Sequence, residues 1–311
     1  MRQSEHRTEE AVNGRSVVTL GKFDGLHRGH QKLIRRVCEL ARGKGEAVVF
    51  AFDFPQERKM LLTAQEREER LRSWGVDRFI ACPFTEELRQ MTPEAFVREV
   101  LQERLHMAGV VVGSDFRFGK DRAGSADSLQ RMGEESGFFV EILQKERDGD
   151  RDISSTYVRE ELTAGHMEKV GELLGYAYAI CGEIVHGRHM GTALGFPTIN
   201  LLPPAGKILP PNGVYAARVF AAGGEYRGIS NLGTKPTVGG DELGLETHLY
   251  DCDRDLYGQQ ARVELLHFLR SERNFASTEE LLAQIERDVA AGRALFAGAQ
   301  PGQPAGPACA S

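Results

Sequence analysis

The chain has 311 residues, 41% of them hydrophobic and 27% charged, a balance typical of a globular protein long enough for two domains. Its net charge of -6 argues against broad binding to nucleic acid or to a membrane surface, because both require basic patches. No apolar run reaches the roughly 20 residues of a membrane helix. The polar N-terminus is not a secretory signal, and the five cysteines are scattered, so we expect a cytoplasmic protein with free thiols.

Strands and helices alternate in the first half of the chain. Apolar runs predict strands at 17–20, 47–52, 78–82, 110–113 and 138–143. Helical spacing predicts a helix at 31–42. A Thr63/Glu66 capping box predicts the start of a helix that ends at 74. An N-cap at Thr92 before Pro93 predicts the start of a helix that ends near 105. This alternation favours a parallel, Rossmann-like α/β domain, which we place at residues 15–175. Ligands of such sheets bind beyond the carboxyl ends of the strands.

The second half follows a different pattern. Short strands are predicted at 179–185, 213–220, 225–231, 246–250 and 261–268, with Gly and Pro between them and no helical pattern between Tyr178 and Arg270. This spacing predicts a small antiparallel β-barrel domain at 176–297. Ser277 and Glu280 predict the cap of a C-terminal helix that ends near Phe296. Residues 298–311 are rich in Gly, Pro and Ala and are predicted to be a disordered tail.

Residues 21–30, G-K-F-D-G-L-H-R-G-H, form the first informative motif, between a predicted strand and a predicted helix. Glycines permit a tight turn, and a helix N-terminus offers N–H groups and positive potential to a phosphate. His27 and His30 are three residues apart and can face one ligand, for which Gly29 leaves room. The segment predicts a phosphate-binding turn. A glycine turn with two helix-capping histidines is the alternative interpretation.

A second anion-binding pattern lies at residues 153–159, I-S-S-T-Y-V-R. Hydroxyl side chains open a predicted helix there, and Arg159 follows one turn later. An ordinary Ser/Thr N-cap explains this segment equally well when it is taken alone. Two such patterns in one α/β half favour a nucleotide site over coincidence.

Together, H-x-G-H and I-S-S-T-x-x-R resemble the signature of the nucleotidyltransferases. The longer G-x-F-D-G-x-H-x-G-H resembles the FMN adenylyltransferase half of the bacterial bifunctional riboflavin kinase/FAD synthetase family. The resemblance implies catalytic roles for His27 and His30, and flavin contacts from Asp115 and Phe116 in the segment 112–119. It implies that the nucleotide is bound by Gly21, Phe23, Asp24, His27, His30, Ser154, Ser155, Thr156 and Arg159.

The chain departs from this family at one loop. The family often has an F-D-P-H-P-like stretch after its second strand, whereas residues 52–56 here are F-D-F-P-Q and lack the histidine. A ligand contact at this loop is therefore in question. Class I aminoacyl-tRNA synthetases also use an H-x-G-H-type tetrad, but the short, acidic chain does not favour them.

Polar side chains in the second half suggest a further site. Thr198 and Asn200, in L-G-F-P-T-I-N, alternate with Ile199 and share one face of a strand, where their oxygens suit Mg²⁺ and phosphate. Glu246 begins another strand, and its carboxylate is suited to take a proton from an attacking hydroxyl. Hydrogen-bonded turn residues and a solvated carboxylate are the alternatives.

These segments resemble the riboflavin kinase domain of the same family. P-T-x-N, a strand glutamate before the D-L-Y-G turn at 255–258, R-x-E at 270–272 and N-x-G-x-K-P-T at 231–237 occur in the family's order. The resemblance implies Mg-nucleotide binding by Thr198 and Asn200, a catalytic base in Glu246 and a flavin neighbour in Arg270. The resemblance also implies a nucleotide-covering flap at 187–192, with Gly187, Arg188 and Gly191 as contacts. Thr192 stands where the family has a basic residue, so Arg188 is the alternative for the phosphate contact of that basic residue.

The predicted function is ATP-dependent phosphorylation of riboflavin to FMN, followed by adenylylation of FMN to FAD, with Mg²⁺ as cofactor. One alternative keeps the kinase and gives the N-terminal half a weak or regulatory nucleotide-binding role. Another is a flavin-binding or nucleotide-binding protein without catalysis. We expect small-molecule partners only, namely ATP and flavins, and a monomer or weak homo-oligomer.

Overall fold

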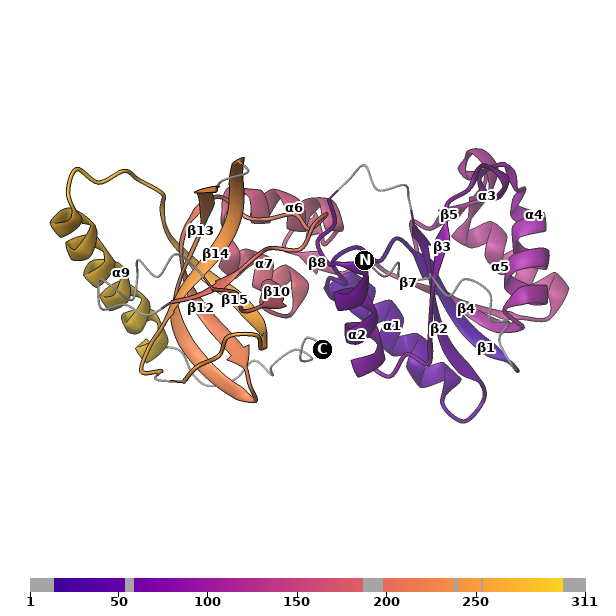
Figure 1. The fold of residues 1–311 in the computed structure, drawn as a ribbon. Helices are drawn as coiled ribbons and strands as arrows, with labels where there is room; N and C mark the ends of the chain where they lie inside the picture. The colour runs from indigo at the N-terminus through magenta and orange to yellow at the C-terminus, as the bar shows by residue number, and fades with distance from the viewer. Residues whose placement is uncertain (1–13, 54–58, 187–197, 238–239, 253, 299–311) are drawn as a thin grey trace. The chain divides into compact units, whose positions relative to one another are not determined.

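The computed structural model describes residues 14–53, 59–186, 198–237, 240–252 and 254–298 (Figure 1). The chain forms two compact units. The N-unit comprises residues 1–59 and 67–154, and the barrel unit comprises residues 60–66 and 155–311. The domain boundary predicted at 175/176 stays a prediction.

A five-stranded parallel sheet forms the centre of the N-unit. Its order is β3-β2-β1-β4-β7. The strands are β1 (Ser16–Gly21), β2 (Glu46–Asp53), β3 (Arg78–Pro83), β4 (Met107–Gly113) and β7 (Phe139–Leu143). β1 lies in the middle and pairs with β2 through Val18 and Val48 and with β4 through Val18 and Val110. The Rossmann-like prediction is confirmed, and the carboxyl end of β1 lies at the centre of the edge where such sheets bind ligands.

Helices cover both faces of this sheet (Figure 1). Val17 packs with Val37 and Ala41 of α1, whereas Val18 packs with Phe96 and Leu101 on the other face. The alternation of β1 side chains therefore joins two apolar layers. One face carries α1 (Arg28–Ala41) and α2 (Ala64–Ser73); the other carries α3 (Glu86–Gln90), α4 (Pro93–Ala95), the π-helix Phe96–Arg104 and α5 (Ala126–Ser136).

The two helix caps predicted at Thr63 and Thr92 are confirmed. Glu66 Oε2 accepts from the Thr63 backbone N–H at 2.7 Å, and Thr63 Oγ1 accepts from that of Glu66 at 3.2 Å. Thr92 Oγ1 accepts from the Ala95 N–H at 3.2 Å. The prediction did not include α5 or the short pairs β5 (Arg117–Phe118) with β6 (Gly124–Ser125) and β8 (Arg147–Asp148) with β9 (Arg151–Asp152).

The barrel unit is built on a six-stranded antiparallel sheet. The strands are β10 (Ala179–Glu183), β11 (Thr198–Leu201), β12 (Gly213–Ala221), β13 (Gly224–Thr237), β14 (Gly240–Leu249) and β15 (Gln260–Ser271), in the order β10-β15-β12-β13-β14-β11. Val185, just after β10, donates its N–H to the Asn200 carbonyl of β11 at 2.8 Å, so the two edges meet. The predicted antiparallel barrel is confirmed, and no helix occurs in the described part of Tyr178–Arg270.

Among the described residues, three helices accompany this barrel: α6 (Ser155–Ala164), α7 (Met167–Leu174) and the C-terminal α9 (Thr278–Gly298). Ser277 Oγ accepts from the Glu280 N–H at 3.2 Å, which confirms the predicted cap. α9 extends two residues past its predicted end at Phe296 and includes the first residue of the predicted tail. The rest of that tail, residues 299–311, lies outside the described residues.

Cys38, Cys82 and Cys252 are free, as predicted. Cys181 is disulfide-bonded, so the prediction of free thiols throughout is wrong at this position. Scattered spacing in the sequence does not exclude a pairing between residues that folding brings together. None of the helices in the described residues is both long and apolar enough to cross a membrane.

Candidate functional site

The turn after β1 has a strained backbone. Phe23 and Leu26 adopt left-handed conformations with φ of 49° and 42°, although neither is glycine. Such residues cost about 1–3 kcal/mol each and are concentrated at functional sites. Both side chains are fully buried, and Gln31 Nε2 donates to the Leu26 carbonyl at 3.0 Å, so packing and hydrogen bonding hold the turn in place.

His27 and His30 stack against each other at the start of α1. Their ring centroids are 3.7 Å apart, with an interplanar angle of 22°. His27 occupies the N-cap position but makes no side-chain capping hydrogen bond, so the alternative of two capping histidines is wrong for it. A Cβ on Gly29 would lie 3.2 Å from the His27 ring; the absence of a side chain therefore makes room for this imidazole.

Burial keeps both imidazoles neutral. It lowers the pKa of His27 to about 4. Burial, and secondly the neighbouring His27, hold the pKa of His30 well below its usual range. The Nδ1 atoms of both rings are buried and have no hydrogen-bond partner among the described residues. Two neutral rings beside a helix N-terminus can donate N–H groups to a phosphate.

The other residues predicted in this turn support the histidines from below. Gly21 ends β1, and a Cβ there would lie 3.3 Å from the Phe23 ring. That ring is buried and lies 5.1 Å from the ring of His30, while Asp24 is also buried. The Phe23 ring therefore packs beneath His30 and is not exposed, and the predicted nucleotide contact of Phe23 stays a prediction.

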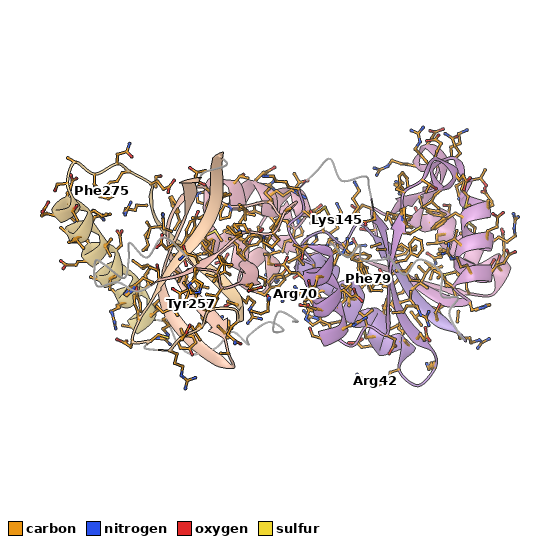
Figure 2. The ribbon with its side chains drawn as sticks, viewed as in Figure 1. Arg42, Arg70, Phe79, Lys145, Tyr257 and Phe275 are labelled. Carbon is orange, nitrogen blue, oxygen red and sulfur yellow. The ribbon has the colours of Figure 1, made fainter. Side chains whose placement is uncertain are left out.

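Asp115 and Phe116 follow the carboxyl end of β4. Lys145, which follows β7, lies 3.0 Å from Asp115 Oδ2 and 3.1 Å from Asp152 Oδ2, and it is labelled in Figure 2. These two hydrogen bonds raise the pKa of Lys145. Phe116 stacks on Phe118 at 5.4 Å. Sequence reasoning missed Lys145, because nothing local shows that it joins two distant acidic residues.

The second predicted anion pattern lies at the start of α6. The helix begins at Ser155, with Ser154 before it and Thr156 in its first turn, and the first turn contains no acidic side chain. Thr156 is exposed, and Arg159 is half-buried one turn later. A helix N-terminus without acidic side chains in its first turn suits a phosphate.

Strand pairing brings the predicted kinase residues together on one face. Asn200 of β11 and Asn231 of β13 are the register partners of Glu246 in β14, on its two sides. The Thr198 hydroxyl donates to Glu246 Oε1 at 2.7 Å. The sequence indicated Thr198, Asn200 and Glu246, whereas the contact of Asn231 with this cluster depends on the sheet order.

Arg270 lies at the end of β15 and is paired with a carboxylate of α9. Its guanidinium donates to the Asp288 carboxylate of α9 with distances of 2.7 to 3.0 Å, and to the Ser271 carbonyl at 3.0 Å. Gln284 also donates to Asp288, at 2.7 Å. The structure therefore shows Arg270 fastening α9 to the barrel; the predicted flavin contact stays a prediction.

Several predicted positions lie outside the described residues: Gly187, Arg188, Gly191 and Thr192 of the flap, and residues 54–56 of the loop that lacks the family's histidine. The described residues contain no group of three or more His, Cys, Asp or Glu side chains able to hold a metal. Thr198, Asn200 and Glu246 instead offer a hydroxyl, an amide oxygen and one carboxylate. That set fits Mg²⁺, which usually takes one or two protein oxygens and the phosphates of its substrate.

Two family models match the chain. The FAD synthetase model matches residues 9–157, and the riboflavin kinase model matches residues 174–296. Together they cover nearly the whole chain, in the order of the two candidate sites.

Curated relatives match over almost their full length. The bifunctional riboflavin kinase/FMN adenylyltransferase of Escherichia coli K12 is 37% identical, covering 95% of this chain and 97% of that protein. The protein of the same name from Pseudomonas fluorescens is 39% identical, with coverage of 90% and 93%. Among solved structures, one named a macrolide-efflux protein from Streptococcus pneumoniae has a TM-score of 0.82 and 29% identity, covering 90% of this chain and 94% of that one. It supports the fold; its name differs from those of the curated relatives and family models.

Proposed function

Because the chain belongs to the family of bifunctional riboflavin kinase/FMN adenylyltransferases, we propose that His27 and His30 serve its adenylyltransferase activity and Glu246 its riboflavin kinase activity. Riboflavin is phosphorylated to FMN in one reaction, and FMN receives AMP from ATP to give FAD in the other. The observation that carries the proposal is the pair of stacked, neutral histidines on a strained turn at the carboxyl end of β1.

Adenylyl transfer needs no protein nucleophile. A phosphate oxygen of FMN attacks the α-phosphorus of ATP, and the bond to the pyrophosphate oxygen breaks. The protein's contribution is positioning and stabilisation of charge. We propose that His27 and His30 donate N–H groups to the triphosphate, and that Ser155, Thr156 and Arg159 hold the phosphates and the leaving pyrophosphate.

In the kinase reaction, Glu246 takes the proton of the riboflavin 5′-hydroxyl as the hydroxyl oxygen attacks the γ-phosphorus of ATP, and the bond from that phosphorus to the oxygen of the leaving ADP breaks. The hydrogen bond from Thr198 fixes the orientation of the Glu246 carboxylate. Thr198 and Asn200 supply oxygens that would hold Mg²⁺. When bound, the ion offsets the negative charge of the transferring phosphoryl group.

Separate assays of the two reactions test this assignment. His30→Ala is expected to lower FAD formation from FMN and ATP by about 100-fold or more, because it removes a preorganised donor, and to leave FMN formation intact. Glu246→Ala is expected to do the reverse, with FMN supplied directly for the second assay. Equal loss of both activities in either variant, with the fold intact, would contradict the two-site assignment.

The F-D-F-P-Q segment motivates a second candidate, in which the N-terminal half transfers adenylyl groups weakly and mainly senses nucleotide. Incubation of the wild-type chain with FMN, ATP and Mg²⁺, followed by chromatography over time, distinguishes the two. FAD accumulating at a rate comparable with FMN formation from riboflavin supports the first proposal. We further propose a monomer or weak homo-oligomer that acts in the cytoplasm, which light scattering and fractionation test.

A further inference from the structure

Arg67 is a buried arginine on the face of α2 that packs against the sheet. Only 3% of its side chain is exposed, and its guanidinium carbon lies 4.9 Å from the centre of the Phe79 ring of β3. Figure 2 labels Phe79 and, on the same helix as Arg67, Arg70. By contrast, Glu68 and Arg72 of this helix are 46% and 73% exposed. Burial of a cation is unfavourable unless hydrogen bonds and nearby negative charge compensate for its lost hydration, so the partners of Arg67 indicate why it is buried.

The guanidinium joins the carboxyl ends of two neighbouring strands. Nη1 donates to the carbonyl of Lys22, the first residue after β1, at 3.4 Å, and Nη2 donates to Oδ1 of Asp53, the last residue of β2, at 3.5 Å. Both bonds are long, and Nε has no partner among the described residues. β1 and β2 are parallel neighbours, so Arg67 binds the edge of the sheet where the His27/His30 turn begins.

We propose that Arg67 is a positioning residue of the adenylyltransferase reaction. By fixing the Lys22 carbonyl, it holds the peptide that leads into left-handed Phe23, whose ring supports that of His30 at 5.1 Å. A shift at Lys22 is therefore passed through Phe23 to the imidazole that donates to the triphosphate. The inference rests on the proposed function of this turn.

A guanidinium is required for this role because it is a planar fork with several donors. It can bind a carbonyl and a carboxylate on two different strands at once, whereas the ammonium of a lysine is a compact point charge on a flexible stem. Lysine in its place would keep the charge but lose one of the two connections. The Arg67→Lys variant therefore separates the effect of charge from the effect of geometry.

Kinetics of both reactions in full-length variants provide the test. Arg67→Met is expected to lower kcat/KM for ATP in FAD formation by about 100-fold, the cost of a displacement of about 1 Å in a positioned group, and Arg67→Lys is expected to fall in between. Riboflavin kinase kinetics are expected to stay unchanged in both variants. Arg72→Met, on the exposed face of the same helix, is the matched control and should leave both reactions unchanged.

Rescue by a small guanidinium separates positioning from a purely structural role. In Arg67→Ala, millimolar ethylguanidinium is expected to restore FAD formation without changing the kinase rate. Unchanged FAD formation in Arg67→Met, equal loss of both activities, or failure of the rescue in a folded variant would overturn the inference. His30→Ala is measured in parallel: if it too leaves FAD formation intact, the assignment of the turn fails; if it abolishes FAD formation while Arg67→Met does not, only the role of Arg67 fails.

Discussion

At the scale of single residues, the neutral histidines couple the site to the stability of the protein. The pKa of His27 falls from an unfolded value near 6.5 to about 4 in the folded chain. Between these values the unfolded chain binds the proton and the folded chain does not. The free energy of unfolding therefore falls as pH decreases through this window, and His30 contributes in the same direction.

Replacement of the titrating ring tests this coupling. From pH 6.5 to 4.5, the wild-type free energy of unfolding should drop by about 2 kcal/mol more than that of His27→Asn, because the variant has no group there to protonate on unfolding. Urea unfolding is followed by fluorescence of Trp74, the chain's one tryptophan, which lies in the N-unit. Parallel pH profiles in the two proteins would contradict the prediction.

The Thr198–Glu246 hydrogen bond gives a second prediction at this scale. Thr198→Val removes the donor that orients the carboxylate and is expected to lower the kinase kcat by about 10-fold or more, since general-base catalysis depends on this geometry. Thr198→Ser keeps the hydroxyl and should retain most of the rate. FAD formation from FMN serves as the internal control, and a Thr198→Val enzyme with normal kinase kcat would refute the role.

At the scale of helices and strands, local signals carried most of the prediction. The caps at Thr63, Thr92 and Ser277 follow the expected pattern, but α5 was missed. There Ser125 and Ser128 form the reciprocal box, with each Oγ accepting from the other's backbone N–H at 3.1 and 2.8 Å. The usual capping box ends in Glu or Gln, so two serines three residues apart do not predict the start of a helix.

The candidate site also divides into residues that a local pattern indicates and residues that only tertiary contacts bring together. His27 and His30 are three residues apart at the start of α1, so their spacing permits a common ligand, although by itself it fits two capping histidines equally well. The Lys145–Asp115, Arg67–Lys22 and Asn231–Glu246 pairs each join different elements of the fold, and only the tertiary structure brings their members together. Contacts set by tertiary pairing leave no periodic trace in the sequence.

Replacement by alanine is expected to have opposite effects on stability at two glycines that lie in helices. Gly171 of α7 has open space, with the Tyr176 carbonyl 4.0 Å from an added Cβ, so Gly171→Ala should stabilise the barrel unit by about 1 kcal/mol through helix propensity. In α9, a Cβ on Gly292 would overlap the hydroxyl of Tyr250, which is buried and donates to the Val289 carbonyl at 3.3 Å. Gly292→Ala should therefore destabilise it by about 1–3 kcal/mol. Calorimetry showing the same sign for both changes would contradict this account.

At the scale of the whole molecule, the chain path and the compact units do not coincide. Residues 60–66 come between two stretches of the N-unit, yet they belong to the barrel unit. Lys207 holds this segment in place: its Nζ donates to both Glu66 oxygens, at 2.6 and 2.8 Å, and to the Leu61 carbonyl at 3.3 Å. The Lys207 side chain is 0% exposed, and its ammonium lies 4.9 Å from the centre of the Tyr178 ring.

This buried ion pair gives the last prediction. Glu66→Gln preserves the capping box with Thr63, since Gln serves equally in that position, but it leaves the Lys207 charge buried without its counter-charge. The cost should be about 3 kcal/mol in the full chain. Adding Lys207→Met removes the uncompensated charge, so the double variant should recover much of that loss. Thermal unfolding of the two single variants and the double variant measures the coupling, and additive losses would show that the pair does not hold the segment.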